Sequence, residues 1–145
     1  MAEKFYMTWE AYGNCLVELK NRLKRVSNLD DFNYVVGIPR GGLPIAVYLS
    51  HWLNLDLMDI GDFLGDGIRR DNVILVDDLV DEAKTLIALF PNGIKDVFVA
   101  TLFRKPWTPV DYIPNLSLSE TDKWIVFPYE DPMEEPNRGN DEGSL

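Results

Sequence analysis

Apolar residues recur every three or four positions near the start of the chain, which predicts an amphipathic helix over 9–26. The apolar positions are Trp9, Tyr12, Leu16, Leu19, Leu23 and Val26. Thr8 comes directly before the first of them, and a threonine hydroxyl often caps the free N–H groups that begin a helix. The pattern therefore indicates a helix with one face on the protein core and a polar face in water.

Short apolar runs rich in β-branched residues follow, and they predict strands separated by helices. We expect strands at 34–38, 57–60, 73–77, 97–103 and 124–127, the start of another at Tyr112-Ile113, and helices at 43–53 and 84–90. The segment 61–71 has three glycines among polar residues and predicts a loop. Strands that alternate with helices are typical of the α/β class, so we predict a mostly parallel twisted sheet flanked by helices.

The chain has 145 residues, which suits one domain around one core. We place that domain at 1–130. Residues 131–145 are dominated by Glu, Pro, Asn, Gly and Asp, and this composition predicts a weakly ordered acidic tail.

The charge balance argues against a nucleic-acid partner. The chain has 14 Lys and Arg against 24 Asp and Glu, a formal net charge of -10, whereas a phosphate backbone needs clustered cations. Cys15 is the single cysteine, so no intrachain disulfide can form, and we expect a cytoplasmic protein. The first residues lack the apolar run of a signal peptide, and no apolar stretch suits a membrane span, so we expect no membrane partner.

Polar residues follow three of the predicted strands, at the edge where parallel sheets bind ligands. They are Arg40-Gly41-Gly42, Asp77-Asp78 and Arg104-Lys105. Because the carboxyl ends of parallel strands meet at one edge, these groups are the candidates for a binding site.

The pair Asp77-Asp78 ends a buried apolar strand, and an unpaired buried carboxylate is costly. Such a pair needs a partner, for example ribose hydroxyls, Mg²⁺ or an arginine. The alternative is that one acid caps a helix and its neighbour is solvated. This segment alone favours neither interpretation.

The turn Arg40-Gly41-Gly42 can hold an anion, because glycines let backbone N–H groups approach a ligand and a helix follows. The Arg40 guanidinium adds a fork of donors that matches phosphate oxygens. The alternative is an ordinary strand–turn–helix connection, in which two glycines are common.

The glycine turn and the acidic pair, in this order, resemble the type I phosphoribosyltransferases, closest to the bacterial xanthine-guanine (6-oxopurine) branch. The segments 101–106 and 123–130 resemble the fourth strand and the C-terminal segment of that family. The resemblance extends over 34–130 and implies the α/β fold described above with a small C-terminal hood segment.

The resemblance implies a role for each matching residue. Arg40 and Gly41 contact pyrophosphate, and Asp77 and Asp78 hold the ribose hydroxyls directly or through Mg²⁺. Asp81 lies near N7 of the purine and acts as general base.

The remaining roles concern the base and the 5′-phosphate. Lys105 donates to the 6-oxo group, Trp124 stacks on the ring, and Ile125 offers its backbone to the base edge. Thr85 and Lys84 lie in the phosphate loop. The implied reaction transfers 5-phosphoribosyl from phosphoribosyl pyrophosphate to a 6-oxopurine and releases pyrophosphate, with Mg²⁺ as cofactor and a homodimer or larger assembly.

Two features depart from the family. In the phosphate loop only Asp81 and Thr85 fit, and we expect Glu82 to turn outward or pair with Lys84, with Ala83 strained if its φ is positive. The loop 61–71, which carries Arg69 and Arg70, is short for the family's mobile lid.

These departures leave other functions open. A non-catalytic nucleotide-binding or regulatory module of the same fold is the main alternative. An unrelated phospho-acceptor receiver domain also has paired acids and a lysine at strand ends, but it leaves the glycine turn and the Trp124 segment unexplained.

Overall fold

The computed structural model describes residues 3–26, 28–65, 67 and 69–131, and its centre is a five-stranded sheet. The strands are β2 (Tyr34–Gly37), β3 (Asp56–Met58), β4 (Val73–Val80), β5 (Phe98–Arg104) and β6 (Leu116–Glu120). Their spatial order is β3-β2-β4-β5-β6, and every neighbouring pair is parallel. The predicted parallel α/β sheet is confirmed.

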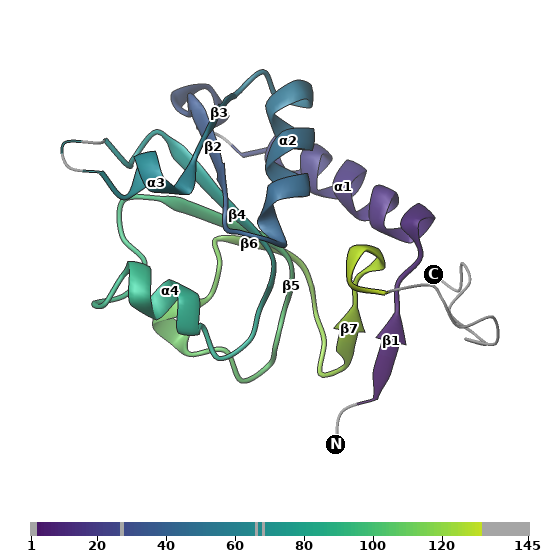
Figure 1. Cartoon of the computed structure of the whole chain (residues 1–145). Coiled ribbons are helices and arrows are strands. Elements are labelled where there is room, and N and C mark those ends of the chain that lie inside the picture. The colour runs from purple at the N-terminus through teal and green to yellow at the C-terminus, as the bar shows by residue number, and fades with distance from the viewer. Residues whose placement is uncertain (1–2, 27, 66, 68, 132–145) are drawn as a thin grey trace.

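Helices cover both faces of this sheet, as Figure 1 shows. They are α1 (Trp9–Leu23), α2 (Gly42–Trp52), α3 (Ile60–Phe63) and α4 (Lys84–Leu89). Alternate residues of β4 serve two cores: Ile74 and Val76 pack in the core with α1 and α2, whereas Val73 and Leu75 pack in the core with α3 and α4. Burial of both faces explains why the strand is apolar without interruption.

The central strand β4 is longer than the sequence pattern predicts, and its extra length determines where the acidic pair Asp77-Asp78 lies. The predicted strand ended at Asp77, but β4 continues to Val80. The pairing of β4 with β2 ends at Val76, but its pairing with β5 continues, from Asp77 opposite Thr101 to Val80 opposite Arg104. The ladder with β5 satisfies the backbone, so the two acids stand on an extended strand instead of in a turn.

A second, two-stranded sheet forms a small hood beside the main one (Figure 1). It pairs β1 (Lys4–Tyr6) with β7 (Trp124–Val126) in parallel, with Phe5 opposite Ile125. The sequence predicted β7 but not β1, because three residues are too few to show a period. The N-terminal segment thus holds the C-terminal hood.

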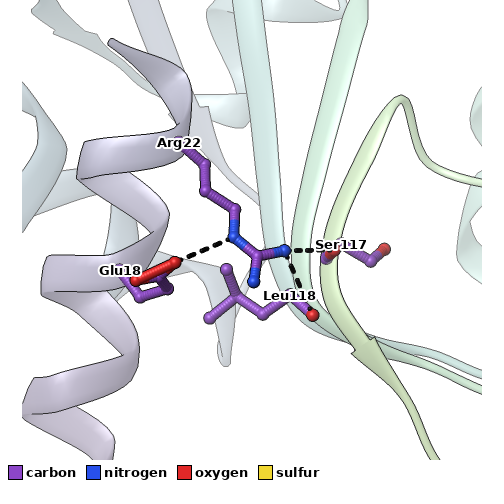
Figure 2. Close-up of polar contacts among 4 residues, drawn as sticks. All are labelled: Glu18, Arg22, Ser117 and Leu118. Carbon is purple, nitrogen blue, oxygen red and sulfur yellow. Dashed lines mark hydrogen bonds and ion pairs between the residues drawn. The ribbon is translucent and has the colours of Figure 1, made fainter. Parts of the chain in front are cut away.

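The polar face of α1 supports the edge of the sheet. Nη1 of Arg22 donates to the backbone oxygens of Leu118 (3.2 Å) and Ser117 (3.5 Å) in β6, while its Nε pairs with Glu18 at 3.0 Å (Figure 2). These contacts occupy carbonyl groups that an edge strand would otherwise expose.

Several predicted boundaries are confirmed and others are wrong. Thr8 caps α1, since its Oγ1 accepts from the Ala11 N–H at 3.1 Å. The segment predicted as a strand over 57–60 ends at Met58, and the predicted loop begins with the short helix α3.

The strand expected to start at Tyr112 is also wrong. Tyr112 ends a 3-10 helix (Val110–Tyr112), and the strand that follows, β6, was not predicted. The hydroxyl of Tyr112 donates to the Phe90 carbonyl at 2.5 Å and accepts from the Gly93 N–H at 3.1 Å. The tyrosine therefore anchors the turn after α4, which a propensity argument does not reveal.

The tail predicted at 131–145 lies outside the described residues, apart from Asp131. Among the described residues, no helix has the length and apolar character needed to span a bilayer.

Candidate active site

The polar groups singled out in the sequence gather at the carboxyl edge of the sheet. Arg40 and Gly41 come just after β2, Asp77 and Asp78 lie in β4, and Lys105 follows β5. These three strands are neighbours, so the topology brings the groups to one edge.

The glycine turn after β2 packs directly against β4. A Cβ on Gly41 would lie 2.1 Å from Oδ2 of Asp78, and one on Gly42 would lie 2.3 Å from the Val76 carbonyl oxygen. The peptide bond between Pro39 and Arg40 is cis. Gly42 is therefore required by the fold, because its Cβ would meet backbone atoms, whereas a Cβ on Gly41 would displace the Asp78 carboxylate.

The acidic pair is held by its own backbone and by the C-terminal segment. Asp78 N–H donates to Oδ1 of Asp77 at 2.8 Å, and the Tyr129 hydroxyl donates to Oδ2 of Asp78 at 2.5 Å. Burial raises the pKa of Asp77 to about 9, and the charge on Asp78 adds to the shift. Burial and the same charge also raise the pKa of Tyr129, which keeps its hydroxyl protonated and donating.

The alternative reading of the pair as a helix cap with a solvated neighbour is wrong. The residue at the cap position of α4 is Ala83, and no side chain caps that helix. Burial holds the pKa of Asp77 well above its ordinary value, and a cation or a hydroxyl-rich ligand beside the carboxyl would favour its charged form.

The loop after β4 has the geometry expected from its unusual sequence. Ala83 has φ 64° and ψ 27°, the left-handed conformation that favours glycine. Glu82 and Lys84 form an ion pair of 3.4 Å, with both side chains exposed. The expectation that Glu82 pairs with Lys84 is confirmed, and so is the positive φ at Ala83.

A pocket of about 320 Å³ lies at this loop. Its walls combine Asp77 and Thr101 from the strands, Asp81 from the loop, and Lys84 and Thr85 from the first turn of α4. It therefore brings together the residues predicted for the ribose and the 5′-phosphate, except Asp78.

A second pocket, of about 390 Å³, brings together the residues predicted for the purine. Its lining includes Lys105, Trp124 and Ile125 together with Asp78 and Asp81. Trp124 is 55% exposed, so it is not a core aromatic, and Lys105 is 4% exposed, so it is not a solvated strand end.

The two pockets meet at Leu79 and Asp81, which line both. A base in the second pocket and a ribose phosphate in the first would thus share Asp81 as a wall. This arrangement follows from the extra length of β4, which carries the strand past the acidic pair to the loop.

Sequence reasoning missed two residues of the site. Trp107 lines the second pocket, and its indole N–H donates to Oδ1 of Asp81 at 2.5 Å. Tyr129 holds Asp78, as described above. Trp107 directly follows the strand-end residues Lys105-Pro106, and an aromatic residue at such a place was the available clue.

The residues predicted for pyrophosphate, and the two arginines of the loop 61–71, lie outside both pockets. Arg40 and Gly41 line neither pocket. Arg69 donates to Asp71, and the Arg70 guanidinium lies 4.9 Å from the centre of the Phe63 ring.

The sheet order, the turn packed on an acidic strand end and the small hood define the fold of the type I phosphoribosyltransferases. No family model matches the chain. A xanthine-guanine phosphoribosyltransferase of Cereibacter sphaeroides is 33% identical over 136 residues, covering 74% of this chain and 75% of the relative. Another from a Ruegeria species is 26% identical over 169 residues, covering 94% and 92%.

Solved structures agree with these relatives. A purine phosphoribosyltransferase from Pyrococcus horikoshii superposes with a TM-score of 0.71 at 32% identity, covering 89% of this chain and 95% of that one. A xanthine-guanine-hypoxanthine phosphoribosyltransferase from Helicobacter pylori has a TM-score of 0.69 at 20% identity, covering 88% and 94%, which supports the fold. The chain belongs to the xanthine-guanine phosphoribosyltransferase family, and the receiver-domain alternative is wrong.

Proposed function

We propose that the chain is a purine phosphoribosyltransferase, an enzyme that transfers 5-phosphoribosyl from phosphoribosyl pyrophosphate to a 6-oxopurine and releases pyrophosphate. The observation that carries the proposal is the convergence of Asp81, Lys105 and Trp124 in one pocket beside the acidic pair. These residues come from three separate segments of the chain, and a flat aromatic face with a few placed polar groups is what a purine requires.

In this proposal each group of the second pocket contacts the base. Trp124 stacks on the purine ring, Ile125 offers backbone groups to its edge, and the buried Lys105 donates to the 6-oxo oxygen. The Lys105 amino group already donates to the Lys123 carbonyl, and this contact aims it. Asp81 takes the proton that N7 loses as the new bond forms, which is general base catalysis.

The first pocket holds the donor in this proposal. Asp77 and Asp78 bind the ribose hydroxyls, and Lys84 and Thr85 bind the 5′-phosphate. Positive charge grows on the ribose ring as pyrophosphate leaves, and the fixed carboxylate of Asp78 stabilises it. Arg40 and Gly41 bind the leaving pyrophosphate.

The acidic pair also fits a magnesium ion that arrives with the donor. Among the described residues, no group of three or more His, Cys, Asp or Glu side chains is placed to hold a metal. Mg²⁺ typically takes one or two carboxylates and shares substrate phosphates, so Asp77 and Asp78 with pyrophosphate are a sufficient set. When bound, the ion would neutralise charge on the leaving pyrophosphate.

The altered phosphate loop is compatible with activity. A carboxylate aimed at a phosphate is repulsive, but Glu82 is exposed and paired with Lys84. The altered loop and the short lid were the two reasons to consider a non-catalytic module, and the ion pair weakens the first of them.

The proposal also covers the extent of the domain, the assembly and the location of the protein. We assign 1–130 to one phosphoribosyltransferase domain and 131–145 to an acidic tail. We also propose a homodimer or larger assembly and a cytoplasmic location.

The test is pyrophosphate release with phosphoribosyl pyrophosphate, Mg²⁺ and guanine, xanthine or hypoxanthine in turn. We expect release that depends on the base and falls at least about 100-fold in Asp81→Asn, the usual share of a general base. The Glu18→Gln variant on α1, away from both pockets, is the matched control and should keep full activity. Absence of release with every base, while GMP still binds, would point to the non-catalytic module.

A further inference from the structure

Trp107 is placed between the two charged groups that face a purine in the second pocket. Its indole N–H donates to Oδ1 of Asp81 at 2.5 Å, and the Lys105 ammonium lies 5.5 Å from the centre of its ring. The side chain is 52% exposed, although it lines the pocket. One residue therefore contacts both the acid and the cation of the site.

The turn that carries Trp107 is anchored without help from the indole. Thr108 is buried, and its Oγ1 donates to the Asp81 carbonyl at 2.9 Å. The Thr108 N–H donates to the Lys105 carbonyl at 3.1 Å, and the Lys105 N–H donates to the Val80 carbonyl at 3.0 Å. These backbone contacts hold the turn on the end of β4, so a change of the Trp107 side chain should leave the fold intact.

Among the residues that the structure describes, the Trp107 indole is the one side-chain donor to Asp81, and it holds Oδ1. A carboxylate has two oxygens, and a hydrogen bond to one of them limits rotation of the group while the other stays free to accept. Asp81 is itself exposed, so its side chain would otherwise sample several rotamers. The indole thus selects one orientation of the acid before a base arrives.

We infer that Trp107 is a positioning residue for Asp81 and the second aromatic wall, with Trp124, of the purine pocket. The inference rests on the proposed function and adds to it the residue that orients the general base. The indole N–H prepares the acceptor oxygen, and the ring face limits the pocket to flat ligands.

The first experiment separates the two roles by kinetics with hypoxanthine. In Trp107→Phe the ring stays and the donor is lost, so we expect kcat to fall about tenfold with KM for hypoxanthine within about twofold. In Trp107→Ala the ring is lost as well, so KM should also rise about tenfold. Trp52→Phe is the matched control, because Trp52 is 60% exposed on α2 and lines neither pocket.

The second experiment is a double-mutant cycle on kcat with hypoxanthine, with Trp107→Phe, Asp81→Ala and both together. Because Trp107 acts through Asp81, its effect should disappear in the Asp81→Ala background. The inference is overturned if the effects of the two substitutions add in the double variant. It is also overturned if Trp52→Phe lowers kcat and stability as much as Trp107→Phe does.

The two proposals fail in different ways. If the wild type releases pyrophosphate and Trp107→Phe has the same kcat, the role of Trp107 is rejected and the transferase proposal is retained. No release from the wild type rejects the transferase, and calorimetry of hypoxanthine with Trp107→Ala against Trp52→Phe then still decides whether Trp107 is a wall of the pocket.

Discussion

The hydroxyl of Tyr129 donates a 2.5 Å hydrogen bond to Oδ2 of Asp78, and this contact joins the hood to the central strand. Tyr129 lies just after the hood strand β7, whose Trp124 and Ile125 line the second pocket. Asp78 belongs to the acidic pair and also touches that pocket. The segment proposed to bind the base is therefore tied directly to the residues proposed to bind the ribose.

Removal of this hydroxyl should weaken both the fold and the donor site. We expect Tyr129→Phe to lower the free energy of unfolding by about 1.5–2 kcal/mol, as for a hydrogen bond to a charged group. KM for phosphoribosyl pyrophosphate should rise more than KM for the base, because Asp78 loses its orientation. Urea unfolding and steady-state kinetics check both, and Tyr48→Phe on α2 should stay within about 0.5 kcal/mol of wild type. An unchanged donor KM would contradict the coupling.

The raised pKa of Asp77, about 9, predicts how stability depends on pH. An aspartate ordinarily titrates near pH 4, so Asp77 contributes stability that is fully present below about pH 4 and lost as pH rises toward 9. The slope from this one group is at most about 1.4 kcal/mol per pH unit.

Asp77→Asn removes that titration while keeping an acceptor for the Asp78 N–H. We expect its free energy of unfolding to exceed that of wild type at pH 8 by more than at pH 5. Urea titrations at several pH values measure this, and Asp30→Asn in the short helix before β2 is a control on an exposed acid. A difference that is constant over this range would show that Asp77 is ionised in the folded chain.

The Glu82–Lys84 ion pair predicts opposite effects of two neutral substitutions on donor binding. Glu82→Gln frees Lys84 for the 5′-phosphate and should tighten binding of phosphoribosyl pyrophosphate, by up to about fivefold for an exposed charge. Lys84→Gln leaves a carboxylate beside the phosphate and should weaken binding by a similar factor. Calorimetry at two salt concentrations checks the result, since both effects should shrink at high salt. Changes of the same sign in both variants would show that the pair lies away from the phosphate.

The left-handed conformation of Ala83 predicts a strong dependence on side-chain shape. Ala83→Val places a β-branched residue at φ 64° in a buried position, so we expect a loss of at least about 2 kcal/mol. Ala88→Val on the exposed face of α4 should cost about 0.5 kcal/mol, as helix propensity alone requires. Thermal unfolding of the two variants makes the comparison. Equal losses would mean that residue 83 is free to leave this conformation.

The fold class and the edge of the sheet that carries the site were predictable from local patterns. The apolar run 73–76 predicted a central strand because burial on both faces requires apolar residues at successive positions. The Arg40 turn, the acidic pair and Lys105 each follow a predicted strand, and this predicted that they would meet, because parallel strands place their carboxyl ends at one edge. The place of Trp124 in the site was implied by the family resemblance.

The tertiary structure alone decided the rest. Asp77 and Asp78 resemble a turn in sequence, and only the ladder with β5 keeps them extended. Strand β1 exists only because β7 pairs with it.

The contacts of Trp107 with Asp81, and of Tyr129 with Asp78, join residues far apart along the chain. Periodicity and propensity describe how each segment meets solvent and its own backbone, so the sequence by itself determined the elements and the edge at which they meet. Which side chain holds which carboxylate depends on distances between segments, and those are set only when the sheet and the hood pack together.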